Sequence, residues 1–172
     1  ERLGYQDSES SIKSEQLMKQ MYRSTKTVKQ LNGILLPMLK GRVFSSLPRI
    51  VYDIDEKYYQ VGNAIAVRNV KLFKQQPHEI FNIVRVMQAH NDLSQMAPRT
   101  LRAWWQAAQK IGPDFYADSE NRKMFISMFR RGAGLTHILR FFNLYGMLGR
   151  YIRPWAKIVG LLQHDLFHVY PV

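Results

Sequence analysis

Hydrophobic and polar positions follow a helical period over most of the chain. Near the start, a run of capping and acidic residues at 7–11 precedes apolar residues spaced three and four apart. These residues are Met18, Met21, Thr25, Val28, Leu35 and Leu39. The spacing predicts one long amphipathic helix. Because Gly33 and Pro37 weaken its last turns and Gly41 offers an exit, we expect it to end between Asn32 and Lys40.

The pattern of hydrophobic residues changes between residues 48 and 67. Three short apolar runs, at 50–52, 58–61 and 64–67, are separated by turn-forming residues at 55–56 and 62–63. Short runs of β-branched and aromatic residues between such turns are typical of strands. We therefore predict a small β-hairpin excursion near residues 48–67.

The helical period returns after Asn69 and persists to the end of the chain. Three apolar stripes follow helix-start signals at Pro77, Pro98 and Asp118, and two more cover residues 135–142 and 158–166. Proline in the first turn and aspartate at the cap are common where helices begin. The pattern predicts a mainly α fold, a bundle of roughly seven helices with the β excursion near its front.

Composition narrows the class of protein. The 172 residues are 46% hydrophobic, enough for one domain with a core, and they carry a formal charge of +12. Without cysteine there is no disulfide, zinc-thiolate site or thiol nucleophile, which fits a reducing compartment, so we expect a cytoplasmic protein. No apolar run approaches the ~20 residues of a membrane span. The chain begins at Glu1 without a signal-peptide core, and we expect it to be an internal piece of a longer protein.

Asp53 and Asp55 form the sharpest candidate catalytic motif. Two aspartates on a strand hold the metal ions of nucleotidyltransferases. Such a site also needs a small hydroxyl residue after an upstream glycine, but Arg42 follows Gly41 here, and no third carboxylate is evident. We therefore interpret the pair as part of a hairpin turn.

The histidines offer a second candidate site. His164 and His168 lie four residues apart, so on a helix both imidazoles could reach one metal ion. The same face carries Lys157, and the other three histidines lie in separate segments without ligand spacing. We favour a solvated helix face over a metal site.

Basic residues alternate with aromatic residues in the second half of the chain, a combination found in proteins that bind single-stranded nucleic acid. The set is Arg99, Arg102, Trp104, Trp105, Arg122, Lys123, Arg130, Arg131, Arg140, Arg150, Arg153 and Trp155. Trp104, Phe125, Phe129 and Phe142 lie on apolar stripes, so we expect them in the core. A stand-alone basic helical nucleic-acid-binding module is therefore the alternative function, not the leading one.

The residues by themselves define no self-contained active site. No Ser–His–Asp arrangement is evident, and Gly132-Ala133-Gly134 lacks the Lys-Ser/Thr of a phosphate-binding loop, so we expect it to separate two helices. No catalytic, cofactor-binding or metal-ligating residue is predicted in this chain.

Two segments near the carboxyl end carry a resemblance to a known family. Residues 143–152 include Asn143, Gly146 and the run Leu148-Gly149-Arg150-Tyr151, and residues 158–170 include Gln163-His164-Asp165-Leu166-Phe167-His168. Together they resemble the corresponding junction in bacterial PII uridylyltransferase/uridylyl-removing enzymes. Upstream, the long first helix, the β excursion and the Arg122–Arg131 segment occur in the order expected of that family.

The resemblance implies a bifunctional parent enzyme. One domain of that family transfers UMP from UTP to a tyrosine of the PII signalling protein, an HD-type phosphohydrolase domain removes it, and further domains sense glutamine. Mg²⁺ is implied for the whole enzyme and none is expected on this fragment. By this resemblance Asp53 and Asp55 are not the catalytic pair, and His164, Asp165 and His168 belong to the entry helix of the HD domain. The fragment is expected to be inactive, a scaffold and possible PII-docking surface.

The same resemblance divides the chain. Residues 1–155 would be the central helical domain, and residues 156–172 the start of the HD domain. A cut after Val172 would leave the apolar side of Ile158, Leu162, Leu166 and Val169 without the HD-domain residues that it packs against. We expect this segment to fold back beside residues 135–142 or to pair with a second copy.

Overall fold

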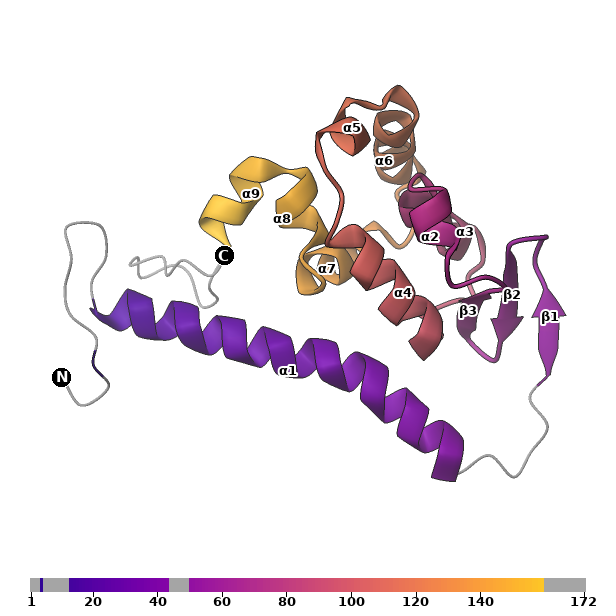
Figure 1. Ribbon diagram of the computed structural model, residues 1–172, viewed down its shortest axis with the longest axis horizontal. Coiled ribbons are helices and arrows are strands. Elements are labelled where there is room, and N and C mark those ends of the chain that lie inside the picture. Colours follow the sequence, from indigo (N-terminus) through magenta and orange to yellow (C-terminus); the bar gives the residue numbers. More distant parts are fainter. Residues whose placement is uncertain (1–3, 5–12, 44–49, 160–172) are drawn as a thin grey trace.

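A computed structural model describes Gly4 and residues 13–43 and 50–159 of the chain. Within these residues the fold is mainly helical with a small β excursion, as the sequence predicts (Figure 1). The described residues form nine helices, where roughly seven were expected, and one four-stranded sheet. The elements are α1 (Lys13–Val43), β1 (Val51–Asp53), β2 (Tyr58–Val61), β3 (Ala64–Val67), α2 (Leu72–Gln75), α3 (Glu79–Ala89), β4 (Gln95–Met96), α4 (Pro98–Ala108), α5 (Pro113–Ala117), α6 (Ser119–Arg131), α7 (Leu135–Leu144), α8 (Met147–Tyr151) and α9 (Arg153–Ile158).

Helix α1 is longer than its sequence predicts. The expected end between Asn32 and Lys40 is wrong, because the helix runs through Pro37 to Val43. A proline inside a helix costs about 3 kcal/mol. Tertiary contacts one and two turns earlier offset this cost: Ile34 is buried, and the Gln30 amide donates a hydrogen bond to the Leu144 carbonyl oxygen at 2.6 Å.

The predicted β excursion is confirmed and is part of a larger sheet. Strands β1, β2 and β3 form an antiparallel meander whose turns lie at the expected positions. Gly62, with a φ of 60°, occupies the tight turn between β2 and β3, where a residue with a β-carbon would be strained. A fourth strand, β4, pairs in parallel with β3 and was not predicted. Its two residues give no alternation that a sequence pattern could detect.

The ends of the later helices follow the local signals in the sequence. Pro98 stands in the first turn of α4, and the Asp118 carboxylate caps α6 by accepting hydrogen bonds from the backbone amides of Glu120 and Asn121 at 2.7 and 3.1 Å. Gly132 and Gly134 have φ values of 70° and 68° and separate α6 from α7. The expectation that this glycine pair divides two helices is confirmed.

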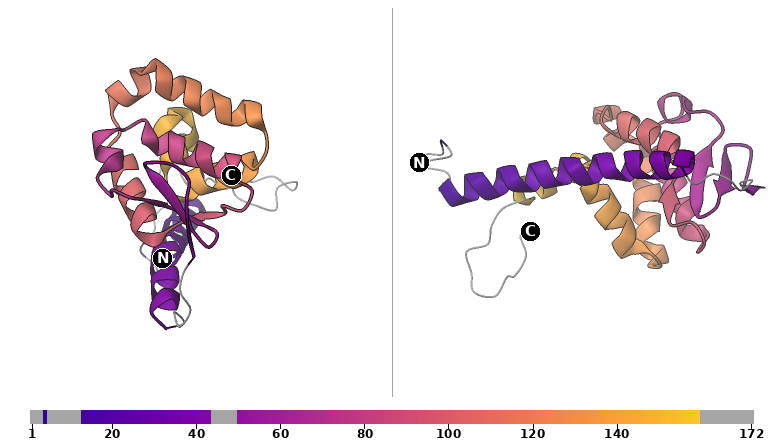
Figure 2. Two further views of the ribbon diagram at one scale, coloured as in Figure 1. Left: turned by 90° about the vertical axis from the view of Figure 1, so that its right-hand side faces the viewer. Right: turned by 90° about the horizontal axis from the view of Figure 1, so that it is seen from below.

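The core lies where α3, α4, α6 and α7 meet. Its centre is aromatic: the Phe81 ring lies 5.3 Å from Phe115 and 6.0 Å from Phe142, and the Trp104 ring lies 4.9 Å from Phe141. The indole nitrogen of Trp104 donates to the Ile80 carbonyl oxygen at 2.8 Å, so the polar atom of this buried ring is satisfied. Helix α1 packs against α4 and α7, and its amino-terminal end extends beyond the other elements (Figure 2).

The predicted behaviour of the carboxyl-terminal segment lies mostly outside the described residues. Ile158 ends α9, and Leu162, Leu166 and Val169 fall in the segment 160–172 that the structure does not describe. The division at residue 155 and the pairing of this segment stay predictions.

Candidate functional site

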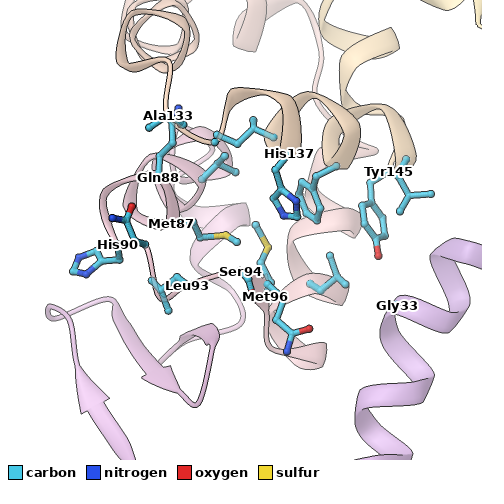
Figure 3. Close-up of a pocket in the computed structure, with 18 residues that line it drawn as sticks. Gly33, Met87, Gln88, His90, Leu93, Ser94, Met96, Ala133, His137 and Tyr145 are labelled. Atoms are coloured by element: carbon cyan, nitrogen blue, oxygen red, sulfur yellow. Dashed lines mark hydrogen bonds between the residues drawn. The ribbon is translucent and has the colours of Figure 1, made fainter.

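An apolar hollow lies between α1, α3, β4, α4 and α7 (Figure 3). It has a volume of about 480 Å³. Most of its wall is apolar, and on one side the wall is formed by Gly33 of α1 next to Tyr145. The apolar lining includes Val84, Met87, Leu93, Met96, Leu101, Ile138 and Phe141. Such a hollow suits an apolar group far better than a charged one.

The polar groups around this cavity are largely engaged in holding the fold. The buried Gln88 amide donates to the carbonyl oxygens of Met128 and Ala133 at 3.1 and 2.8 Å, which fastens α3 to the turn after α6. The Ser94 hydroxyl accepts from the Asn63 amide at 2.7 Å. His137 points toward the cavity and His90 points away from it (Figure 3). No pair of side chains here is placed as a nucleophile with its base.

A second polar cluster surrounds a buried carboxylate, Glu79, at the start of α3. Its side chain is 1% exposed and accepts hydrogen bonds from the Lys57 ammonium at 2.6 Å, from the Asn82 amide at 2.9 Å and from the Tyr58 hydroxyl. His78 Nε2 lies 3.2 Å from the same carboxylate. The cluster joins β2 to α3.

Titration in this cluster follows from its geometry. Burial acts to raise the pKa of Glu79, but three hydrogen bonds and the Lys57 charge outweigh it, so the pKa lies below its ordinary value. The hydrogen bond to Glu79 raises the pKa of Lys57, and burial followed by the same carboxylate raises the pKa of Tyr58. All three groups thus hold the charge state that stabilises the pairing at neutral pH. This is the behaviour of a structural anchor, not of a general base poised near pH 7.

Sequence reasoning missed both the cavity and the Glu79 cluster. Glu79 stands at the first position of a helix, where an acidic residue is ordinary because it complements the helix dipole. Its burial depends on Lys57 and Tyr58, which lie 22 and 21 residues earlier. No local pattern around Glu79 signals these partners.

The candidate aspartate pair belongs to the β1–β2 turn. The Asp53 carboxylate pairs with Arg68, and Asp55 Oδ1 accepts from the backbone amides of Lys57 and Tyr58 at 2.7 Å each. These bonds are those of a turn-stabilising aspartate. Since one carboxylate faces a guanidinium and the other is engaged by the backbone, the pair does not fit a Mg²⁺ site.

The histidines do not form a metal centre in the part of the chain that the structure describes. Across residues 13–43 and 50–159, no group of three or more His, Asp or Glu side chains could hold a metal ion. His78, His90 and His137 stand on separate elements, and His164, Asp165 and His168 lie outside the described residues. The interpretation of the last three as an HD entry helix stays a prediction.

Two of the aromatic residues considered for nucleic-acid binding are not available for stacking. Trp104 and Phe142 are fully buried, as expected, and cannot stack on bases. Phe125 is partly buried, but the core placement of Phe129 is wrong, because its side chain is 41% exposed. The basic residues of the candidate set are all exposed: Arg99, Arg102, Arg122, Lys123, Arg130, Arg131, Arg140, Arg150 and Arg153. Charge without a matching row of exposed rings does not favour single-strand binding.

None of the helices traced between residues 13 and 159 has the length and apolar content needed to cross a bilayer. The described residues thus define a mainly α-helical domain with a small sheet, an apolar cavity and structurally committed polar clusters.

Comparison with known proteins gives the family. Residues 58–151 match the family described as "Uridylyltransferase GlnD third domain". Over all 172 residues the chain is 56% identical to a bifunctional uridylyltransferase/uridylyl-removing enzyme of Neisseria gonorrhoeae. It is 45% identical over 98% of its length to the enzyme of the same name from Chromobacterium violaceum. In both comparisons it spans 20% of the relative. No solved structure matches it. The chain belongs to the uridylyltransferase GlnD third-domain family.

Proposed function

We propose that this chain is the helical domain that connects the two catalytic parts of a bifunctional uridylyltransferase/uridylyl-removing enzyme. That parent enzyme would transfer UMP from UTP to a tyrosine of the PII signalling protein and remove it by hydrolysis, in nitrogen-status signalling. UTP, Mg²⁺ and glutamine would bind in other domains. The cytoplasmic location stays a prediction.

One observation carries this proposal. The entire chain aligns with a fifth of the bifunctional enzyme of Neisseria gonorrhoeae, while its own polar clusters are committed to turns, caps and the Glu79 anchor. A rigid bundle with an aromatic core suits the role of a scaffold that holds two active sites in a fixed relation.

The scaffold role is tested in the intact polypeptide. Phe81→Ala should destabilise this domain by about 3–5 kcal/mol, because the ring is fully buried. When this domain is unfolded by mild heating, transfer and removal should both lose their wild-type rates, since the relation between the sites is lost. Phe129→Ala, at a 41% exposed ring, is the control and should leave both rates unchanged at that temperature. Wild-type rates from the Phe81→Ala protein above the melting temperature of this domain would contradict the proposal.

The proposal that this chain has no nucleotide or metal site of its own is tested on the chain itself. Calorimetric titration with Mg²⁺ and UTP should give no saturable heat, because Asp53 and Asp55 are engaged by Arg68 and by the backbone. A saturable site that Asp53→Asn abolishes would show that this pair binds the nucleotide.

The docking of PII is a second part of the proposal, supported by the charge of +12. Exposed Arg130 and Arg131 at the end of α6 would contact acidic groups on PII. Binding of PII to the intact enzyme should weaken with salt and with Arg130→Glu/Arg131→Glu, but not with Lys74→Glu on α2. Binding that is insensitive to salt and to the arginine pair would remove this role.

A further inference from the structure

Helix α1 uses only one of its faces within the described fold. The inward face contains Gln30 and Ile34, both buried, and Gly33, which packs against the Tyr145 hydroxyl. The inward face meets α4 and α7.

An apolar stripe lies on the opposite face. It consists of Met21, Val28, Leu31, Leu35 and Leu39, which we call the α1 stripe. At about 100° per residue, the spacings of seven, three, four and four place these side chains in one row. Met21, Val28 and Leu39 lie roughly 120–180° around the helix from Gln30 and Ile34, and Leu31 and Leu35 lie nearer to the inward face. Each side chain of the row is between 46% and 55% exposed. Most residues that define the apolar pattern of this helix in the sequence belong to this uncovered row.

Exposure on this scale needs an explanation. Single exposed apolar residues are normal on soluble proteins, but a continuous row is typical of an interaction surface. Leu36 and Met38 widen the row and are 49% and 41% exposed. The row begins at Met21, and the amino-terminal end of α1 projects past the other elements in Figures 1 and 2.

The charge of helix α1 indicates what kind of partner the row would bind. Helix α1 contains seven Lys or Arg and one Glu, a net of 7 − 1 = +6. Lys29 and Lys40 are exposed beside the row. Two copies of α1 packed on each other would bring these charges together, and like charges at an interface oppose association. The row fits a partner that has an apolar groove with acidic residues on its rim.

We propose that the α1 stripe docks into an acidic-rimmed apolar groove on another domain of the parent polypeptide. This proposal rests on the proposed function, which makes the chain one domain of a larger enzyme. The chain spans 20% of its relatives, so most of such a polypeptide lies outside it. A groove on the same polypeptide meets the row at a high effective concentration, so a modest apolar contact is enough to hold it.

Cysteine labelling in the intact polypeptide tests the docking. Leu35→Cys places a thiol in the row, and Ile126→Cys places a matched thiol on α6, since the two native side chains are 50% and 51% exposed. Labelling of each peptide by a maleimide is followed by mass spectrometry and compared with the urea-unfolded protein. We expect at least tenfold slower labelling at position 35 in the folded enzyme and little protection at position 126. Equal rates at the two positions would overturn the proposal.

Two further measurements identify the partner. Lys29→Glu/Lys40→Glu should reduce the protection at position 35 several-fold, because acidic rim residues would then repel the row; unchanged protection would contradict an acidic rim. Labelling is repeated across a dilution series in which light scattering follows self-association. The protection at position 35 should not depend on enzyme concentration. Protection that appears only as the enzyme self-associates would assign the row to a second copy and overturn the proposal.

The docking proposal and the scaffold function can fail separately. Free labelling at position 35, together with loss of both activities when this domain melts, would remove the docking and leave the scaffold. Retention of both activities above the melting temperature of this domain would remove the scaffold whatever the labelling shows.

Discussion

The hydroxyl of Tyr145 occupies the space that a side chain at Gly33 would need. Gly33 lies in the middle of α1 and Tyr145 caps the carboxyl end of α7, so the pair fixes how closely these helices approach. The tyrosine has little freedom to retreat, because it is 3% exposed and its ring lies 4.9 Å from Phe141 and 5.8 Å from Trp105. Glycine at position 33 is therefore a packing requirement.

Gly33→Ala should destabilise the chain although alanine is the better helix former. Alanine gains about 1 kcal/mol in helix propensity, while forcing a methyl group against a buried ring costs about 1–3 kcal/mol. We expect a net loss of about 1 kcal/mol in urea unfolding. Asn32→Ala, at the exposed neighbouring position, should stabilise by a few tenths of a kcal/mol.

Removing the Tyr145 hydroxyl tests whether it causes the loss of stability in Gly33→Ala. In a Tyr145→Phe background, Gly33→Ala should lose most of its penalty, because the overlapping atom is gone. If Gly33→Ala stabilises the wild-type chain as Asn32→Ala does, the close approach of α1 and α7 is incorrect.

Neighbouring tryptophans on α4 should differ in their sensitivity to loss of the indole nitrogen. Trp104 Nε1 donates to the Ile80 carbonyl oxygen at 2.8 Å, whereas Trp105 Nε1 is buried and has no hydrogen-bond partner among the described residues. Trp104→Phe loses that bond and leaves unfilled volume in the core, so it should cost about 1–2 kcal/mol more than Trp105→Phe. Chemical unfolding of the two variants measures the difference. Equal costs would contradict the assigned hydrogen bond.

The Glu79 anchor predicts a loss of stability in acid. The pKa of Glu79 is lower in the folded chain than its ordinary value of 4.5, so its contribution is fully present above pH 4.5 and is lost as the pH falls below it. At pH 7, Glu79→Gln should cost about 2 kcal/mol, since Lys57 is 35% exposed and water moderates the lost pairing. The cost should shrink toward pH 3.

A surface pair provides the control for this experiment. Glu120 pairs with Lys123 at 2.7 Å, but both side chains are well exposed, so Glu120→Gln should cost far less stability than Glu79→Gln. The two variants are compared by urea unfolding from pH 3 to pH 7. Similar costs for Glu79→Gln and Glu120→Gln at pH 7 would show that the anchor contributes no more than a surface pair.

Two substitutions of Asp118, the cap of α6, should distinguish the stability that comes from its hydrogen-bond acceptor from the stability that comes from its charge. Asp118→Ala removes both hydrogen bonds to the first turn and should cost about 1 kcal/mol. Asp118→Asn keeps an acceptor oxygen and loses only the favourable interaction with the helix dipole, so it should cost a few tenths of a kcal/mol. Thermal unfolding would place the alanine variant clearly below the asparagine variant; the reverse order would contradict the capping geometry.

Features decided by neighbouring residues were predictable from the sequence. Asp118, Pro98 and the glycines at 132 and 134 act within one turn of their own position, and the structure places helix ends at each of them. The β1–β2 turn followed from Asp55 for the same reason.

Features decided by distant residues were not predictable. The helix end near Pro37 was wrong because Gln30 bonds to Leu144, 114 residues away. The apolar row of α1 was visible, yet nothing local showed that the opposite face, with Ile34, would be the one to pack. The Glu79 cluster and β4 likewise depend on partners in β2 and β3.

The hydrogen bond between Gln30 and Leu144 also constrains the order of folding. Translation at about 5–20 residues per second separates the synthesis of these two residues by roughly 6–23 seconds, because they are 114 positions apart. Local helix formation takes about a microsecond, so α1 can coil long before the carbonyl that anchors it exists. Helix α1 can pack against α4 as soon as α4 has been made, but its attachment to α7 must wait until Leu144 has been synthesised. That attachment is therefore a late, non-local step in the folding of the domain.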